Sequence, residues 1–192
     1  MADPLRVGTR LALACGVAGP TAFVAAWVAG GVLRSSDYSP VSQAISQLAR
    51  EGTSSRPLMT CGFVVFGGLV PVYAYALGKQ LRSPGTRRAA AVSGLATLAV
   101  AALPLSRAGG QPVDVWHALA AGTGYAAQVL APLFGARRLP ARGASYAVSA
   151  VALGCLVGSV VLPDLTGLLQ RAGLTAVDAW YVTVAVHLLR RG

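Results

Sequence analysis

Six long apolar segments, separated by short polar stretches, dominate the pattern of hydrophobic and polar positions along this chain. Each is close to the roughly 20 residues that a helix needs to cross the hydrocarbon core of a bilayer. None has the polar face expected of a helix in a soluble protein. We therefore predict one all-α domain over residues 1–192, a polytopic membrane helical bundle of about six transmembrane helices. The predicted spans are residues 11–32, 57–77, 89–105, 113–134, 144–162 and 174–189.

The stretch between the first two spans has a helical pattern of its own. Ser39 supplies a hydroxyl for a helix N-cap, and Pro40 suits the first helical turn. Apolar residues then recur at helical spacing among serines and glutamines. This pattern predicts a short amphipathic outer helix at about residues 40–50, which either lies on the outer membrane surface or folds over the bundle.

Composition supports a membrane protein, since 55% of the residues are hydrophobic and only 11% are charged. A soluble domain usually carries about 25% charged residues. The chain also contains 23 glycines, and small residues let helix backbones approach closely in membranes. Each of the three cysteines lies in an apolar segment, so we interpret them as packing residues and not as a disulfide framework.

The distribution of charge predicts how the chain is threaded. A net charge of +10 is compatible with nucleic-acid binding, but the charges cluster in alternate loops. One set of loops and both termini carry eleven of the sixteen basic residues and a single acid, Asp3. The other loops balance five basic against five acidic residues. The positive-inside rule then predicts cytoplasmic termini (N-in/C-in), and because the charges follow this topology we expect no nucleic-acid partner.

Several short motifs, taken in order, resemble the uncharacterised bacterial membrane family numbered 998 among the domains of unknown function. They are Tyr38-Ser39-Pro40, residues 45–49, His117, residues 167–171, Trp180 and Leu188-Leu189-Arg190. Such proteins are similar in plan to the Frag1/DRAM/Sfk1-like group of six-span proteins, some of which are linked with lipid organisation. The resemblance implies a six-span protein of the bacterial cytoplasmic membrane but no settled activity, so it assigns no catalytic residue.

Ionisable side chains in or near the spans are candidates for chemistry, because burying them in a membrane is costly. Asp114 and His117 are three residues apart and share a helix face, and Asp178 is expected in the outer part of the sixth helix. These three are the candidate catalytic residues, with Asp114 orienting His117 as an acid–base pair. Alternatively, Asp114 and Asp178 cap the starts of helices, and His117 is a polar contact between helices.

A closed bundle is expected to gather further polar groups around an outward-facing cavity. The candidate ligand-binding residues are Asp37, Arg107, Asp164, Arg171, Trp116 and Trp180. Arg107 or Arg171 is suited to holding a phosphate headgroup. The two Asp-x-Trp segments, residues 114–116 and 178–180, suggest that helix pairs three–four and five–six are related units. Interfacial belts of Trp and Tyr produce the same pattern, so both interpretations stay open.

Signatures of known enzymes and metal sites are absent from the sequence, with no GxSxG, HExxH or GxxxxGK[ST] motif. His117 and His187 are predicted at opposite interfaces, roughly 30 Å apart, so they cannot share a metal. We expect no metal and no cofactor.

Three functions stay open. We favour a non-enzymatic protein that binds or organises membrane lipids, or scaffolds a protein partner or a homo-oligomer. The first alternative is an embedded enzyme that acts on a lipid or isoprenoid with Asp/His groups. The second is a small transporter, against which we count the expected lack of charge at the bilayer midplane.

Overall fold

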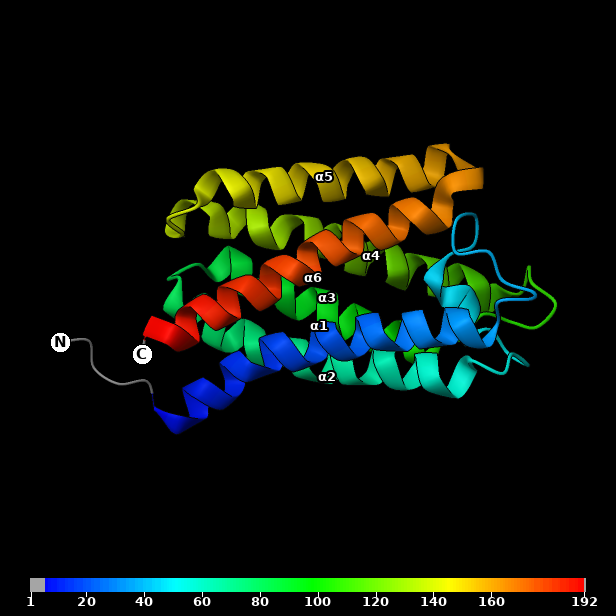
Figure 1. Cartoon of the computed structure of the whole chain (residues 1–192), viewed down its shortest axis with the longest axis horizontal. Helices are drawn as coiled ribbons and strands as arrows, with labels where there is room; N and C mark the ends of the chain where they lie inside the picture. The colour runs from blue at the N-terminus through cyan, green and yellow to red at the C-terminus, as the bar shows by residue number, and fades with distance from the viewer. Residues whose placement is uncertain (1–5, 192) are drawn as a thin grey trace.

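The computed structural model describes residues 6–191, and that part of the chain folds entirely into helices and their connections (Figure 1). The long helices are α1 (Val7–Leu33), α2 (Arg56–Gln80), α3 (Pro84–Ala102), α4 (Pro112–Gly135), α5 (Arg142–Val161) and α6 (Thr166–Arg191). Short 3-10 helices lie in three connections: η1 (Ile45–Ala49), η2 (Ala136–Arg138) and η3 (Pro163–Leu165). The predicted all-α class is confirmed for these residues. Asp3 and the outermost ends of the predicted domain lie outside them.

Four helical segments are long and apolar enough to cross a membrane, namely α1, α2, α5 and the η3–α6 segment Pro163–Arg191. Helices α3 and α4 do not pass the same test of hydropathy. Alanine, glycine, serine and threonine fill much of both helices, and these residues are less hydrophobic than valine or leucine. The chain therefore contains several helices with the character of membrane spans, packed beside two that are rich in small residues.

The six helices form a ring in chain order. Each packs against the next, and α6 packs back against α1 to close the bundle. Helix α1 begins and α6 ends at the same end, which we call the terminal end, together with the α2–α3 and α4–α5 connections (Figure 1). The opposite end, which we call the loop end, carries η1 and the α3–α4 and α5–α6 connections.

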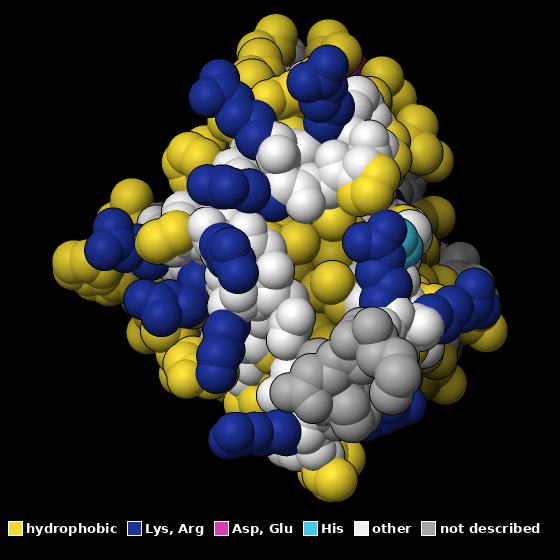
Figure 2. Space-filling model, turned by 90° about the vertical axis from the view of Figure 1, so that its left-hand side faces the viewer, with side chains coloured by type: hydrophobic (Ala, Val, Ile, Leu, Met, Phe, Trp, Pro, Cys, Tyr) yellow, Lys and Arg dark blue, Asp and Glu magenta, His cyan; other side chains and the backbone are white. Residues whose placement is uncertain are grey.

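Basic side chains crowd the terminal end, as Figure 2 shows. The eleven basic residues there are Arg6, Arg10, Lys79, Arg82, Arg87, Arg88, Arg137, Arg138, Arg142, Arg190 and Arg191. The loop end carries five basic and four acidic residues, because Asp178 lies within the bundle and not in a loop. The bundle is therefore strongly polarised in charge from end to end.

Two buried tyrosines fill the centre of the ring. Tyr73 of α2 and Tyr181 of α6 meet edge to face, with their ring centroids 5.7 Å apart. The Tyr73 hydroxyl donates a hydrogen bond of 3.0 Å to the carbonyl of Tyr181. Gly16 of α1 lies directly against the Tyr73 ring, where a β-carbon would overlap it. The missing side chain at Gly16 therefore lets α1 close onto this tyrosine.

The sixth helix begins at Thr166, two turns before the predicted start at residue 174. The prediction followed hydrophobicity, and the polar pair Gln170–Arg171 interrupts it. In the fold these two side chains bond to the α1–α2 loop: Gln170 Oε1 accepts from the Ile45 amide at 2.7 Å, and Arg171 donates to loop carbonyls. Polar residues are thus tolerated in the helix because the loop supplies their partners.

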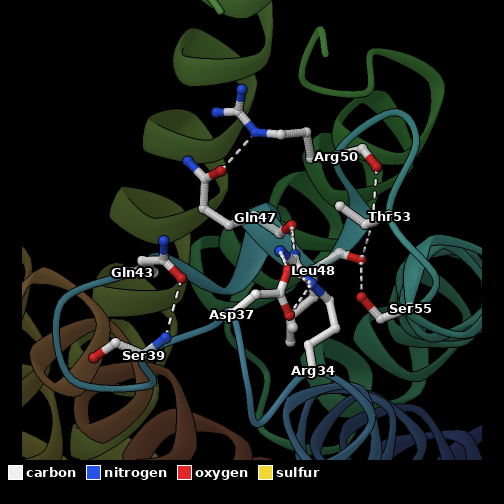
Figure 3. Close-up of polar contacts among 9 residues, drawn as sticks. All are labelled: Arg34, Asp37, Ser39, Gln43, Gln47, Leu48, Arg50, Thr53 and Ser55. Atoms are coloured by element: carbon white, nitrogen blue, oxygen red, sulfur yellow. Dashed lines mark hydrogen bonds and ion pairs between the residues drawn. The ribbon is translucent and has the colours of Figure 1, made fainter. Parts of the chain in front are cut away.

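The predicted outer helix at residues 40–50 is wrong in extent, since only η1 (Ile45–Ala49) is helical. The Ser39 amide donates to the Gln43 side chain at 3.0 Å, which holds the preceding segment in a turn (Figure 3). Ile45 and Leu48 are buried, so η1 folds over the bundle, one of its two predicted positions. Ser55 at the start of α2 donates to the Leu48 carbonyl at 2.7 Å and fixes the end of η1 there.

Candidate functional site

A groove follows the seam where α6 closes the ring against α1. It consists of two hollows that meet at Val28, which lines both. The first, the Arg171 hollow, lies toward the loop end and has a volume of about 350 Å³. The second, the Asp178 hollow, is about 480 Å³ and mainly apolar. Thr183 lies twelve positions after Arg171, so the groove extends along about 18 Å of α6.

Arg171 is buried at one end of this groove, with 8% of its surface exposed. Its Nη1 donates to the carbonyls of Pro40, Gln43 and Gly167 at 2.8, 3.1 and 2.9 Å. Its Nη2 donates to the Tyr38 hydroxyl. Its Nε has no hydrogen-bond partner. The guanidinium also lies 5.4 Å from the ring centroid of Trp27, at cation–π distance.

Within residues 6–191 no carboxylate forms an ion pair with Arg171, and the one ion pair found there joins Arg34 to Asp37 at 2.6 Å. Carbonyl dipoles and aromatic rings stabilise the buried cation but do not neutralise it. A buried charge is costly unless it is paired. The Arg171 hollow is therefore a positively charged pocket at the end of an apolar groove.

The ring of Tyr38 has two guanidinium groups near it, with Arg34 at 5.6 Å and Arg171 at 5.4 Å from the ring centroid. Burial raises the pKa of the Tyr38 phenol, and the nearby Arg171 only partly offsets this. The hydroxyl consequently keeps its proton at neutral pH and donates to the carbonyl of Gln43 or Ala44. By contrast, hydrogen bonds from Arg34 lower the pKa of the exposed Asp37 carboxyl, which is therefore ionised.

Asp178 lies in the second hollow, halfway along α6, with only 2% of its surface exposed. Neither carboxyl oxygen has a hydrogen-bond partner in the part of the chain that the structure describes. Because α6 begins at Thr166, Asp178 does not cap a helix start and is not in the outer part of the helix, so both predictions were wrong. The expectation that the middle of the bundle holds no ionisable residue is corrected for the same reason.

The comparison with known families covers this whole groove. A family described as "Protein of unknown function (DUF998)" matches residues 17–187 of the chain. The chain belongs to the DUF998 family. This confirms the resemblance seen in the sequence motifs. Searches among curated proteins and solved structures gave no match.

Asp114 caps α4 of this DUF998 protein, as the second interpretation of that residue proposed. Its carboxylate accepts hydrogen bonds from the Ser106 amide and hydroxyl, both at 2.7 Å, and from the Gln111 amide at 2.9 Å. His117 is buried, and its Nδ1 lies 2.6 Å from the Leu103 carbonyl, so Nδ1 carries the proton. The two side chains share a helix end but bond to different partners.

The remaining predicted residues do not converge on one polar cavity of the DUF998 protein. Arg107 and Asp164 are exposed at the loop end, in separate connections. Trp116 is 62% exposed, whereas Trp180 is buried and donates to the Ser145 hydroxyl at 2.9 Å. Of the predicted site residues, only Arg171 and Asp178 line the α1–α6 groove. The expected outward-facing polar cavity is thus replaced by a mainly apolar groove with two ionisable residues.

The Asp-x-Trp segments also occupy different positions in their helices. Asp114 lies in the first turn of α4, but Asp178 lies at the middle of α6. The short sequence match therefore does not reflect equivalent places in two related helix pairs. Among residues 6–191 there is also no group of three or more His, Cys, Asp or Glu side chains that could hold a metal ion.

A smaller pocket lies inside the ring beneath η1. Its volume is about 70 Å³, and three phenylalanines and the amide of Gln128 contribute to its wall. Gln128 is 4% exposed, and its Oε1 has no partner. An engineered cavity that binds benzene is about 150 Å³, so this pocket has room for a few waters only. Both hollows of the α1–α6 groove are several times larger than this pocket, at about 350 and 480 Å³.

Sequence reasoning missed Tyr38 and Trp27 as parts of the groove. Tyr38 stood in one of the family-like motifs and followed the first span, which was a usable signal. Trp27 stood within an apolar segment and carried no signal of its own. Its role depends on facing Arg171, which is 144 positions away in the chain.

Proposed function

We propose that this DUF998 protein is an integral membrane protein with six spans that holds a membrane lipid in its α1–α6 groove. Both termini lie in the cytoplasm of a bacterium, and the loop end faces outward. The lipid has an anionic headgroup and comes from the outer leaflet. Its headgroup lies at Arg171, and one chain follows the apolar hollow toward Thr183.

The exposed surface of the helices supports membrane insertion. Large apolar side chains are widely exposed on the helix exteriors, for example Val160 at 78% and Val32 at 70%. A soluble monomer rarely exposes extended apolar surface of this kind. Helices α3 and α4 complete the ring between apolar neighbours, which supports six spans in place of four.

The charge polarity supports the orientation. Eleven basic side chains surround the terminal end, and the loop end is nearly balanced at five basic to four acidic residues. Cytoplasmic loops of membrane proteins carry the excess of Lys and Arg. The basic surface in Figure 2 would then face the cytoplasm and the anionic headgroups of the inner leaflet.

The observation that carries the lipid assignment is the buried Arg171, which has no carboxylate partner among residues 6–191 and lies at one end of an apolar groove. A phosphate-bearing headgroup supplies the missing charge, and an acyl chain suits the aliphatic walls. The groove is about 18 Å long, and one leaflet of hydrocarbon is about 15 Å deep. Charge and length therefore both fit a single lipid that stands upright against the seam.

The acid–base alternative has less support. Asp114 is engaged by Ser106 and Gln111, and His117 by the Leu103 carbonyl, so neither faces the groove. An enzyme that used these two groups would need to break helix-capping contacts before it could act.

A pair of matched variants tests the proposal. Val28→Trp fills the junction of the two hollows, whereas Val157→Trp places the same side chain on an exposed face of α5. The protein is purified in detergent and analysed by native mass spectrometry after incubation with phosphatidylglycerol. We expect one tightly retained lipid on the wild type and on Val157→Trp, and its loss from Val28→Trp.

Two results would overturn the proposal. One is equal retention of phosphatidylglycerol by both variants. The other is a lipid-free dimer that Val28→Trp dissociates, because this would assign the groove to a second copy of the chain.

A further inference from the structure

Asp178 has hydrogen-bonding capacity that the described part of the chain does not satisfy. Both of its oxygens are buried and have no partner. No Lys, Arg or His lines its hollow, and the nearby hydroxyls of Thr21, Thr175 and Thr183 do not bond to it. Buried polar groups in native proteins nearly always have a partner, and leaving one unpaired is destabilising. The partner is therefore to be sought in whatever occupies the hollow.

The carboxyl requires a hydrogen-bond donor in either protonation state. An ionised carboxylate offers two acceptor oxygens, and a protonated carboxyl still leaves one carbonyl oxygen to accept. A saturated acyl chain offers no donor, and the ester groups of an ordinary diacyl phospholipid only accept. A protonated Asp178 can donate to such an ester, but a lipid of that type leaves at least one Asp178 oxygen without a donor in either protonation state.

We propose that the lipid in the groove carries a neutral hydrogen-bond donor, a chain hydroxyl or an amide N–H, which Asp178 accepts. This inference rests on the lipid assignment of the α1–α6 groove. A neutral donor is favoured over an ammonium group because an ammonium is far costlier to bring to this depth. The apolar lining of the hollow accepts the rest of the chain.

The distance between Arg171 and Asp178 along α6 indicates how far apart the two polar groups of the ligand lie. Arg171 and Asp178 are seven residues apart, which is two helical turns or about 10 Å. Both line the same groove. The preferred lipid therefore has an anionic group and a donor group separated by about 10 Å along its length, which corresponds to a donor on the first carbons of a chain and not at its tip.

The experiment compares two probes that differ by one group. Purified full-length protein is titrated with phosphatidylglycerol that carries a 3-hydroxyacyl chain and with unsubstituted phosphatidylglycerol of equal length, and bound lipid is counted by native mass spectrometry. A hydrogen bond of about 1.4 kcal/mol corresponds to tenfold in affinity. We expect about a tenfold preference for the hydroxylated lipid. A third probe, an anionic lipid with one amide-linked chain, separates the amide source from the hydroxyl source.

Asp178→Leu is the decisive variant, because it keeps the branching of the side chain at Cγ and removes both acceptors. It breaks no hydrogen bond of the described structure, so the protein is expected to fold. We expect the ratio of its affinities for the donor-bearing and the unsubstituted lipids to fall from about ten to about one. Asp178→Asn retains an acceptor oxygen and is expected to keep part of the preference.

The outcomes separate the two proposals. If the wild type binds all three probes equally and Val28→Trp binds none, the proposed hydrogen bond to Asp178 is wrong but the lipid groove stands. A preference that persists unchanged in Asp178→Leu also overturns the proposed hydrogen bond. If no probe binds the wild type, the proposal that the groove binds a lipid is wrong.

Discussion

Replacing Arg171 with methionine removes the guanidinium that ties the α1–α2 loop to α6 and leaves an unbranched side chain in its place. In the wild type Arg171 donates to the carbonyls of Pro40 and Gln43 and to the Tyr38 hydroxyl. A hydrogen bond that involves a charged group contributes about 1.5–3 kcal/mol. Two such contacts at the lower value give a loss of about 3 kcal/mol from the docking of the loop.

Local opening of this loop is then favoured by about 100-fold, because each 1.4 kcal/mol is a factor of ten. Hydrogen exchange of the detergent-purified protein measures this opening. The amides to follow are those of Gln43, bonded to the Ser39 carbonyl at 2.9 Å, and Leu168, bonded to the Val41 carbonyl at 2.8 Å. Both are expected to exchange about 100-fold faster in Arg171→Met, while amides in the middle of α2 are unaffected.

Two further variants control this experiment. Arg107→Met removes an exposed arginine at the same end of the bundle and is expected to leave the protection of the loop unchanged. Arg171→Lys keeps the charge but lacks the planar fork, so it is expected to give an intermediate rate. Unchanged protection of Gln43 and Leu168 in folded Arg171→Met protein would refute the view that Arg171 holds the loop down.

Other predictions concern packing and orientation. Gly16→Ala places a β-carbon into the buried Tyr73 ring, and overpacking of this kind costs about 1–3 kcal/mol, so the melting temperature in detergent falls by several degrees. Gly68→Ala meets open space and should melt like the wild type, and equal melting of both variants would contradict this account of the α1–α2 contact. Trp180→Phe loses the hydrogen bond to Ser145, which contributes about 1 kcal/mol to stability. We expect its melting temperature to fall by about 2–4 °C. An unchanged melting temperature would show that this bond does not stabilise the fold. A fluorescent reporter fused after the last residue should be active in the cytoplasm, and alkaline phosphatase inserted between α3 and α4 should be active outside, the reverse pattern being incompatible with the proposed topology.

The sequence by itself determined the order of the six long helices and the difference in charge between the two ends of the bundle. A membrane-length helix satisfies its backbone hydrogen bonds within its own segment, so its position follows from a local run of apolar residues. The charges of the connections also follow directly from the sequence. They distinguish the two ends of the bundle without any knowledge of how the helices pack. For the same reason the helix-capping role of Asp114 was among the interpretations of the sequence, since a cap depends on residues only a few positions away.

The tertiary structure alone decided the site. Arg171 lies within a helix because the carbonyls of Pro40 and Gln43 accept hydrogen bonds from its side chain. These carbonyls are about 130 positions away in the chain and contact Arg171 only when α6 packs against α1. That closure also extends α6 to Thr166 and so moves Asp178 from the predicted helix start to the middle of the bundle. The groove exists because the first and last helices of the chain turn particular faces toward each other, and hydrophobic pattern along one helix does not specify which residues of a distant helix it will face.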